Sequence, residues 1–98
     1  MKKFLLLDQD QEPMIELEYG KFSCGILELG GGLFVVNVVT HGDGHSYQVG
    51  IYRDVEEAAQ AVQTLKDFAF AVVGENKGFE MPVADEPVTA LEILDLLL

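Results

Sequence analysis

Five short strand-like segments precede a single long helical pattern, and this order limits the chain to a few folds. In residues 14–19 apolar side chains alternate with two glutamates, which is the period of a half-buried antiparallel strand. Gly20-Lys21 and Asp43-Gly44 are typical of hairpin turns. The apolar parity of residues 22–29 shifts around Gly25, which predicts a bulge there. The strands that we expect are 3–7, 14–19, 22–29, 33–39 and 46–52.

The segment after Asp54 has helical spacing and begins with N-terminal signals. Asp54 and Glu57 stand at the spacing of a capping box, and Gly74 suits the end of a helix of about twenty residues. Residues 79–82 are typical of a short last strand, which Pro82 confines to a sheet edge or ends. Thr89 and Glu92 form a second capping box at the start of a helix over 90–97.

Together these elements predict one α+β domain over residues 1–98, with the order β-β-β-β-β-α-β-α. We expect an antiparallel sheet of about five or six strands, the long helix across one face, and a short C-terminal helix near 89–98. A helix of about eight residues is not stable alone in water. It therefore docks on the sheet, on the long helix or on a neighbouring copy as an oligomerisation element.

The charge balance excludes several kinds of partner. The chain has 17 acidic residues and 6 basic ones, for a formal net charge of -11. Phosphate backbones and anionic membrane surfaces would repel such a protein, so direct nucleic-acid or membrane binding is not expected. The single cysteine, Cys24, forms no internal disulfide, and no apolar run approaches the ~20 residues of a membrane span. We expect a cytoplasmic protein. Its acidic face either serves solubility or imitates DNA.

Motifs for catalysis or cofactors are weak. His41, Asp43 and His45 stand at alternate positions and are candidate ligands for zinc or iron, but the glycines between them favour a plain hairpin tip. The Gly30-Gly31-Gly32 run lacks the lysine and hydroxyl of a phosphate-binding loop, and no serine lies in a nucleophile elbow. We therefore predict no cofactor, no metal and no enzymatic activity.

Apolar side chains near the C-terminus are the strongest functional signal. Residues 68–73 are apolar on all sides, and residues 91–98 contain only two polar members. Either the short helix covers the domain's own sheet, or these residues bind another protein or a second copy. The residues that we expect at such an interface are Phe68, Phe70, Leu94 and Leu97.

Three short motifs carry a resemblance to a known group of proteins. They are a strand that ends in Gly50-x-Tyr52, the helix start with Glu56-Glu57, and the segment 79–82, Phe-Glu-Met-Pro. Through these three motifs, residues 34–82 resemble small uncharacterised proteins of phages and prophages in Gram-positive bacteria. The chain departs from that pattern at Asp54, where the family more often has threonine before the acids. The resemblance implies a phage-type accessory protein that acts by binding and has no assigned catalytic residues.

The sequence therefore predicts a non-enzymatic cytoplasmic binding protein that forms a homo-oligomer or binds a protein partner. Two alternatives stay open. One is an acidic DNA mimic that inhibits a DNA-binding protein. The other is a small-ligand protein that sequesters a nucleotide in a pocket between subunits, where few cations are available. Beyond the amino-terminal pair these are Lys21, Arg53, Lys66 and Lys77.

Overall fold

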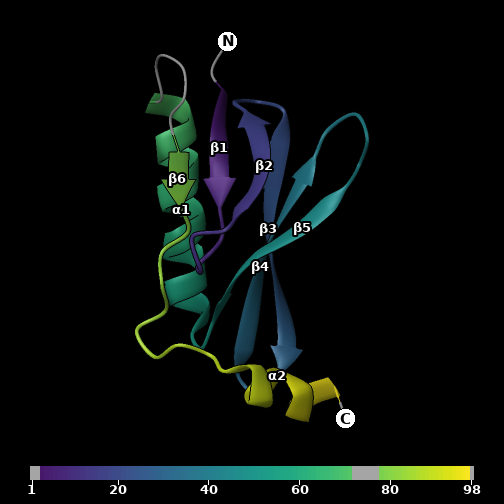
Figure 1. The fold of residues 1–98 in the computed structure, drawn as a ribbon, viewed down its shortest axis with the longest axis vertical. Helices are drawn as coiled ribbons and strands as arrows, with labels where there is room; N and C mark the ends of the chain where they lie inside the picture. The colour runs from purple at the N-terminus through teal and green to yellow at the C-terminus, as the bar shows by residue number, and fades with distance from the viewer. Residues whose placement is uncertain (1–2, 72–77, 98) are drawn as a thin grey trace.

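A computed structural model describes residues 3–71 and 78–97 of the chain. Its elements follow the predicted order of five strands, a helix, a strand and a helix (Figure 1). Their bounds are β1 Lys3–Leu7, β2 Pro13–Glu18, β3 Phe22–Gly30, β4 Leu33–Thr40, β5 Ser46–Tyr52, α1 Val55–Ala71, β6 Gly78–Glu80 and α2 Ala90–Leu97.

The strands divide between two small sheets. Sheet A has the strand order β2-β1-β6, and sheet B has the order β3-β4-β5. The α+β class, six strands, the long helix packed on a sheet and the short C-terminal helix are confirmed. The structure differs from the single antiparallel sheet that the sequence predicts, because the strands form two sheets. Sheet A is also mixed, since β6 pairs parallel with β1 and places Phe79 opposite Leu6. Such a pairing joins residues more than 70 positions apart in the chain and leaves no local signal in the sequence.

The turn between β2 and β3 changes sheet instead of closing a hairpin. The Lys21 N–H donates to the Glu18 carbonyl at 3.0 Å, and Gly20 has a φ of 82° in the third position of this turn. Glycine suits that position because L side chains are disfavoured at positive φ. The hairpin predicted at Gly20-Lys21 is therefore wrong, since β2 pairs with β1 and β3 pairs with β4.

The predicted bulge at Gly25 is also wrong. Gly25 pairs regularly with Asn37, and the register shift between β3 and β4 falls between Glu28 and Gly30. The strand therefore keeps one parity along most of its length. Ile26 is half-buried, whereas Leu27 points to the other face and is 53% exposed. Leu29, at the register shift, is 41% exposed. A bulge at Gly25 would instead shift the apolar parity, so that Leu27 and Leu29 would share a face with Phe22 and Cys24.

The core lies between the two sheets and α1. Its largest fully buried side chains include Phe4 and Leu6 of β1, Tyr52 of β5 and Leu65 of α1. The central strand β4 is covered on both faces, with Val36 and Val38 at 0% exposure on one side and Val35 at 1% on the other. Within the described part of the chain, the buried Oδ1 of Asn37 in this strand accepts no hydrogen bond.

The start of α1 follows the prediction in part. The Asp54 carboxylate accepts the Glu56 N–H at 2.7 Å, which is an N-cap interaction. Glu57 accepts instead from the backbone N–H of Asp85 at 2.9 Å and thus ties the C-terminal segment to the helix. The proposed helix end at Gly74 lies outside the described residues.

Candidate functional site

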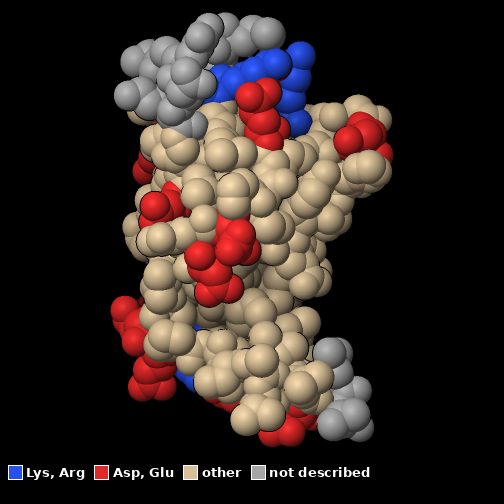
Figure 2. All heavy atoms as spheres, in the orientation of Figure 1, with Lys and Arg blue, Asp and Glu red and all other residues tan. Residues whose placement is uncertain are grey.

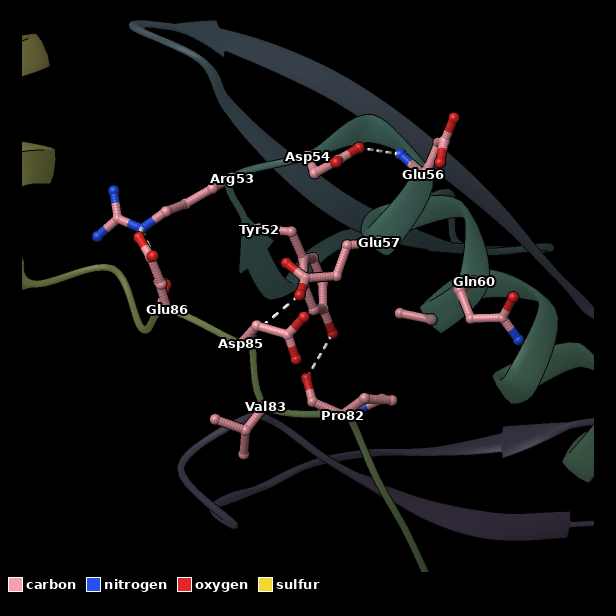
Figure 3. A pocket seen from close by; sticks show the side chains of 11 residues that line it. Tyr52, Arg53, Asp54, Glu56, Glu57, Gln60, Pro82, Val83, Asp85 and Glu86 are labelled. Carbon is pink, nitrogen blue, oxygen red and sulfur yellow. Dashed lines mark hydrogen bonds and ion pairs between the residues drawn. The ribbon is translucent and has the colours of Figure 1, made fainter.

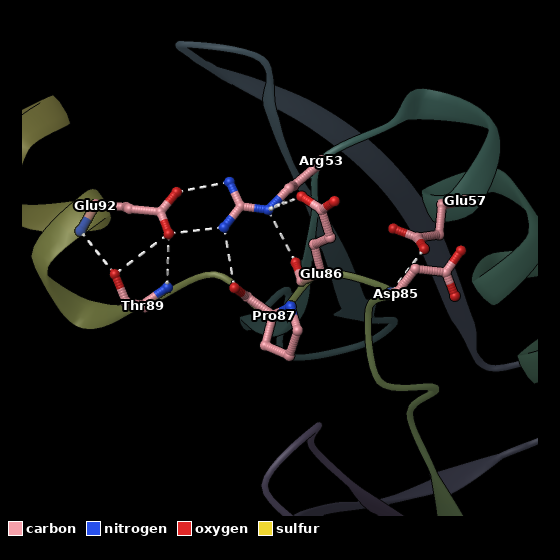
Figure 4. Close-up of polar contacts among 7 residues, drawn as sticks. All are labelled: Arg53, Glu57, Asp85, Glu86, Pro87, Thr89 and Glu92. Carbon is pink, nitrogen blue, oxygen red and sulfur yellow. Dashed lines mark hydrogen bonds and ion pairs between the residues drawn. The ribbon is translucent and has the colours of Figure 1, made fainter.

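Arg53, directly after β5, holds the segment that leads into α2. Its guanidinium donates two hydrogen bonds to the Glu92 carboxylate, from Nη1 to Oε2 at 2.6 Å and from Nη2 to Oε1 at 2.7 Å. It also donates to two backbone carbonyls, those of Glu86 and Pro87, each at 2.9 Å (Figure 4). A planar guanidinium that binds a carboxylate with both prongs fixes orientation as well as distance. The arginine therefore sets where α2 begins.

Glu92 has a second role at the start of α2. Its Oε1 accepts the Thr89 N–H at 3.3 Å, while its own N–H donates to Thr89 Oγ1 at 3.2 Å. The predicted capping box is thereby confirmed. The hydrogen bond from Arg53, followed by that from the Thr89 backbone, lowers the pKa of Glu92 to about 2. The carboxylate is therefore ionised at neutral pH and holds both groups.

Held in this way, α2 leaves apolar side chains uncovered. Leu91 is 73% exposed and Leu94 is 52% exposed. Leu97 belongs to α2, but its side chain lies outside the described part. α2 lies at the lower end of the molecule in Figure 1. In the same orientation, Figure 2 shows mostly uncharged atoms at this end, with acidic atoms near its rim.

The exposed leucines of β3 lie at the same end of the molecule as α2. The pairs Phe34–Tyr52 and Gly30–Leu33 place the β3–β4 turn beside the end of β5, where Arg53 binds α2 (Figure 1). We define the apolar end as the four leucines that β3 and α2 expose there. These are Leu27, Leu29, Leu91 and Leu94.

The two phenylalanines predicted for an interface lie elsewhere. Phe68 is half-buried, with ring centroids 5.2 Å from Phe4 and 5.1 Å from Phe79, and serves the packing of α1. Phe70 is 62% exposed and stacks edge-on with Tyr19 at 5.6 Å. Because α1 starts beside Arg53 and rises about 1.5 Å per residue, Phe70 stands roughly 20 Å along the helix from that end. The structure does not bring Phe70 and Leu94 together.

An acidic pocket lies between the start of α1 and the segment 82–86. It has a volume of about 700 Å³ (Figure 3). Tyr52 lies at its base, and the Tyr52 hydroxyl donates to the Pro82 carbonyl at 2.6 Å. Burial, helped by the negative charge of Glu57, raises the pKa of Tyr52 to about 12. Five carboxylates line the pocket: those of Asp54, Glu56, Glu57, Asp85 and Glu86.

This lining favours cationic over anionic groups. The one lining guanidinium, that of Arg53, is already bound to Glu92 and to backbone carbonyls. An anionic ligand would meet uncompensated carboxylates, and Coulomb repulsion at short range disfavours it. Over residues 3–71 and 78–97, no three histidine, cysteine or carboxylate side chains form a group able to hold a metal ion.

The histidine loop forms local contacts. The Asp43 carboxylate accepts from the Thr40 hydroxyl and from the His45 N–H, and its Oδ2 lies 3.4 Å from His45 Nδ1. His41 turns away, and its Nε2 lies 2.7 Å from Ser23 Oγ. The predicted hairpin between β4 and β5 is confirmed. At its tip Asp43 contacts His45, whereas His41 contacts Ser23, so the three candidate ligands do not converge on one point.

The Ser23–His41 pair is the one feature of this region that sequence reasoning missed. The pair forms because β3 and β4 are hydrogen-bonded, which sets Phe22 opposite Thr40 and brings His41 beside Ser23. Both side chains are exposed. A serine nucleophile also needs its base oriented by a third group and an oxyanion site. Within the described residues, no carboxylate is hydrogen-bonded to His41.

The helices and the comparisons with known proteins add little. In the described part of the chain, neither helix has the length and apolarity needed to cross a bilayer. No protein-family model, curated protein or solved structure matches the chain.

Proposed function

We propose that this chain is a non-enzymatic binding protein that acts through its apolar end and self-associates there. The observation that carries the proposal is the fixed presentation of Leu91 and Leu94. Two charge-assisted hydrogen bonds from Arg53 hold α2 in place, yet two of its leucines are more than half exposed. Apolar side chains on a rigid element are typical of association surfaces. A cytoplasmic, phage-type accessory role is the setting that we propose for it.

Light scattering coupled to size exclusion tests the proposal. We expect the wild type to elute as a dimer or larger, and Leu94→Glu to reduce its mass to that of the protomer. Val83→Glu is the matched control, because Val83 is also an exposed aliphatic residue, with 63% of its surface accessible, and the substitution adds the same charge. A wild type that stays monomeric, or a Leu94→Glu variant that keeps the wild-type mass, would contradict self-association through α2.

A second candidate function is inhibition of a DNA-binding protein by mimicry. The observation that favours it is the acidic pocket, which five carboxylates line. Such a surface attracts lysine and arginine side chains. Binding to a basic partner would then weaken steeply with salt, since ions screen exposed charges beyond about 10 Å at 0.1 M. The test is pull-down with the wild type and with Glu56→Gln/Asp85→Gln at two salt concentrations. If the amount of partner captured changes neither with salt nor with the substitutions, DNA mimicry is rejected.

A further inference from the structure

The strand β3 has one hydrogen-bonded neighbour among the described residues. It pairs with β4 along one side, and its other side is the edge of sheet B. Its nine residues include one charged side chain, Glu28, and no proline or lysine. Proteins usually protect long edge strands with charges, proline or a covering segment, because free N–H and C=O groups attract another strand. β3 has no proline, and Glu28 is its one charged side chain.

We propose that β3 pairs with β3 of a second copy of this chain, antiparallel and about a two-fold axis at Ile26, which rests on the self-association proposed above. Ile26 is the middle residue of β3, so this register pairs residues 24–28 of the two copies, the part of the strand before the register shift near Leu29. Opposite residues share a face of the new sheet. Leu27 then stands opposite Gly25 of the second copy.

Side-chain sizes favour this register. A Cβ built on Gly25 meets no atom within 4 Å, so there is open space above this glycine. Leu27, 53% exposed on the same face, fills that space in the second copy, and the symmetry makes the contact twice. Glycine inside a strand weakens it and often marks the close approach of another backbone. An identical strand is therefore a suitable partner, because each copy sets its Leu27 over Gly25 of the other copy.

The net charge of -11 does not prevent the pairing. In this register Glu28 stands opposite Cys24 of the second copy, so the two Glu28 residues are four strand positions apart. At about 3.3 Å per residue this separation is roughly 13 Å. That distance exceeds the Debye length of about 8 Å at physiological ionic strength, so the repulsion is largely screened. The dimer contains one continuous six-stranded sheet, built from two copies of the three-stranded sheet B.

Three variants of equal charge test the pairing: Leu27→Glu, Leu94→Glu and Val83→Glu. Each replaces an exposed apolar side chain, so the fold is expected to survive, and circular dichroism checks that it does. Sedimentation equilibrium from low to high micromolar protein gives the dimer dissociation constant. We expect Leu27→Glu to raise it at least tenfold and Val83→Glu to leave it within twofold of wild type.

The outcomes separate this inference from the proposed function. If Leu94→Glu abolishes the dimer and Leu27→Glu does not, the β3 pairing is overturned and association through α2 stands. Because Leu27 also belongs to the apolar end, dissociation by Leu27→Glu supports the pairing only together with slower hydrogen exchange of residues 22–30 at high protein concentration. A wild type that stays monomeric overturns both. Hydrogen exchange is a second measurement on the unmodified chain: residues 22–30 should exchange more slowly at high protein concentration, and exchange that ignores concentration would overturn the pairing.

Discussion

Arg53 and Glu92 lie 39 residues apart in the chain and bind each other through two parallel hydrogen bonds of 2.6 Å and 2.7 Å. This pair connects the end of β5 with the first turn of α2. A helix of eight residues is too short to be stable alone in water, so its position depends on such tertiary contacts. The orientation of the exposed leucines on α2 therefore depends on a contact outside the helix.

Substitution of Glu92 should loosen α2 selectively. In Glu92→Gln we expect faster hydrogen exchange over residues 89–97 and unchanged exchange in β4, because the pair and half of the capping box are weakened while the core is intact. Glu86→Gln is the control, since the Glu86 carboxylate is 82% exposed and lies 3.8 Å from Arg53. Equal exchange in Glu92→Gln and wild type would show that other contacts hold the helix.

Acid should release α2 without unfolding the core. The pKa of Glu92 is lowered from 4.5 to about 2, so the folded state favours the carboxylate. Its contribution is fully present above pH 4.5 and is lost as the pH falls toward 2. The measurement is an NMR titration of the Glu92 side chain together with the α2 amides. A midpoint near the ordinary glutamate pKa would contradict the pairing with Arg53.

Removal of the Tyr52 hydroxyl should cost modest stability. Tyr52→Phe deletes the 2.6 Å hydrogen bond to the Pro82 carbonyl, which keeps a second donor in Gln9 Nε2 at 3.1 Å. We therefore expect the free energy of unfolding to fall by about 1 kcal/mol, at the lower end of the range for a partner left unsatisfied. Denaturant titration measures this, with Tyr47→Phe in the same strand as the control. A loss above about 3 kcal/mol would indicate a larger role in the core.

High pH should destabilise the fold through the same tyrosine. The pKa of Tyr52 is raised from 10 to about 12, so the folded state favours the neutral phenol. Its contribution is fully present below pH 10 and is lost as the pH rises toward 12. Ultraviolet absorbance of phenolate against pH should show one tyrosine that ionises later than the others. The late transition should disappear in Tyr52→Phe, and its persistence would assign it to another residue.

Gly50 and Gly25 should respond in opposite directions to alanine. A Cβ on Gly50 would stand 2.9 Å from Tyr52 Cε2 and 3.1 Å from its hydroxyl, so Gly50→Ala must displace a fully buried ring. We expect a loss of about 1–3 kcal/mol. Gly25→Ala meets open space at an ordinary φ and should stabilise the protomer by about 0.4–1 kcal/mol. Thermal unfolding at low protein concentration measures both, and similar shifts would contradict the packing of Tyr52.

Local patterns predicted the elements well. The bounds of β1, β5 and α2, the element order, the hairpin after Thr40 and the capping box at Thr89 all agree with the structure. Each depends on residues a few positions apart, whose spacing and turn chemistry act within one segment. Leu94, which the sequence predicts at an interface, is more than half exposed, and its place in an interface stays a prediction.

Contacts between distant segments decided the rest. The division into two sheets follows from which strands pair with each other, and β6 pairs with β1 although the paired residues lie more than 70 positions apart. The acidic pocket, the Ser23–His41 contact and the pairing of Arg53 with Glu92 likewise join residues from separate elements. A periodic pattern determines which face of a strand or helix is apolar. Only the packed chain determines what covers that face, because the covering side chains come from elsewhere in the sequence.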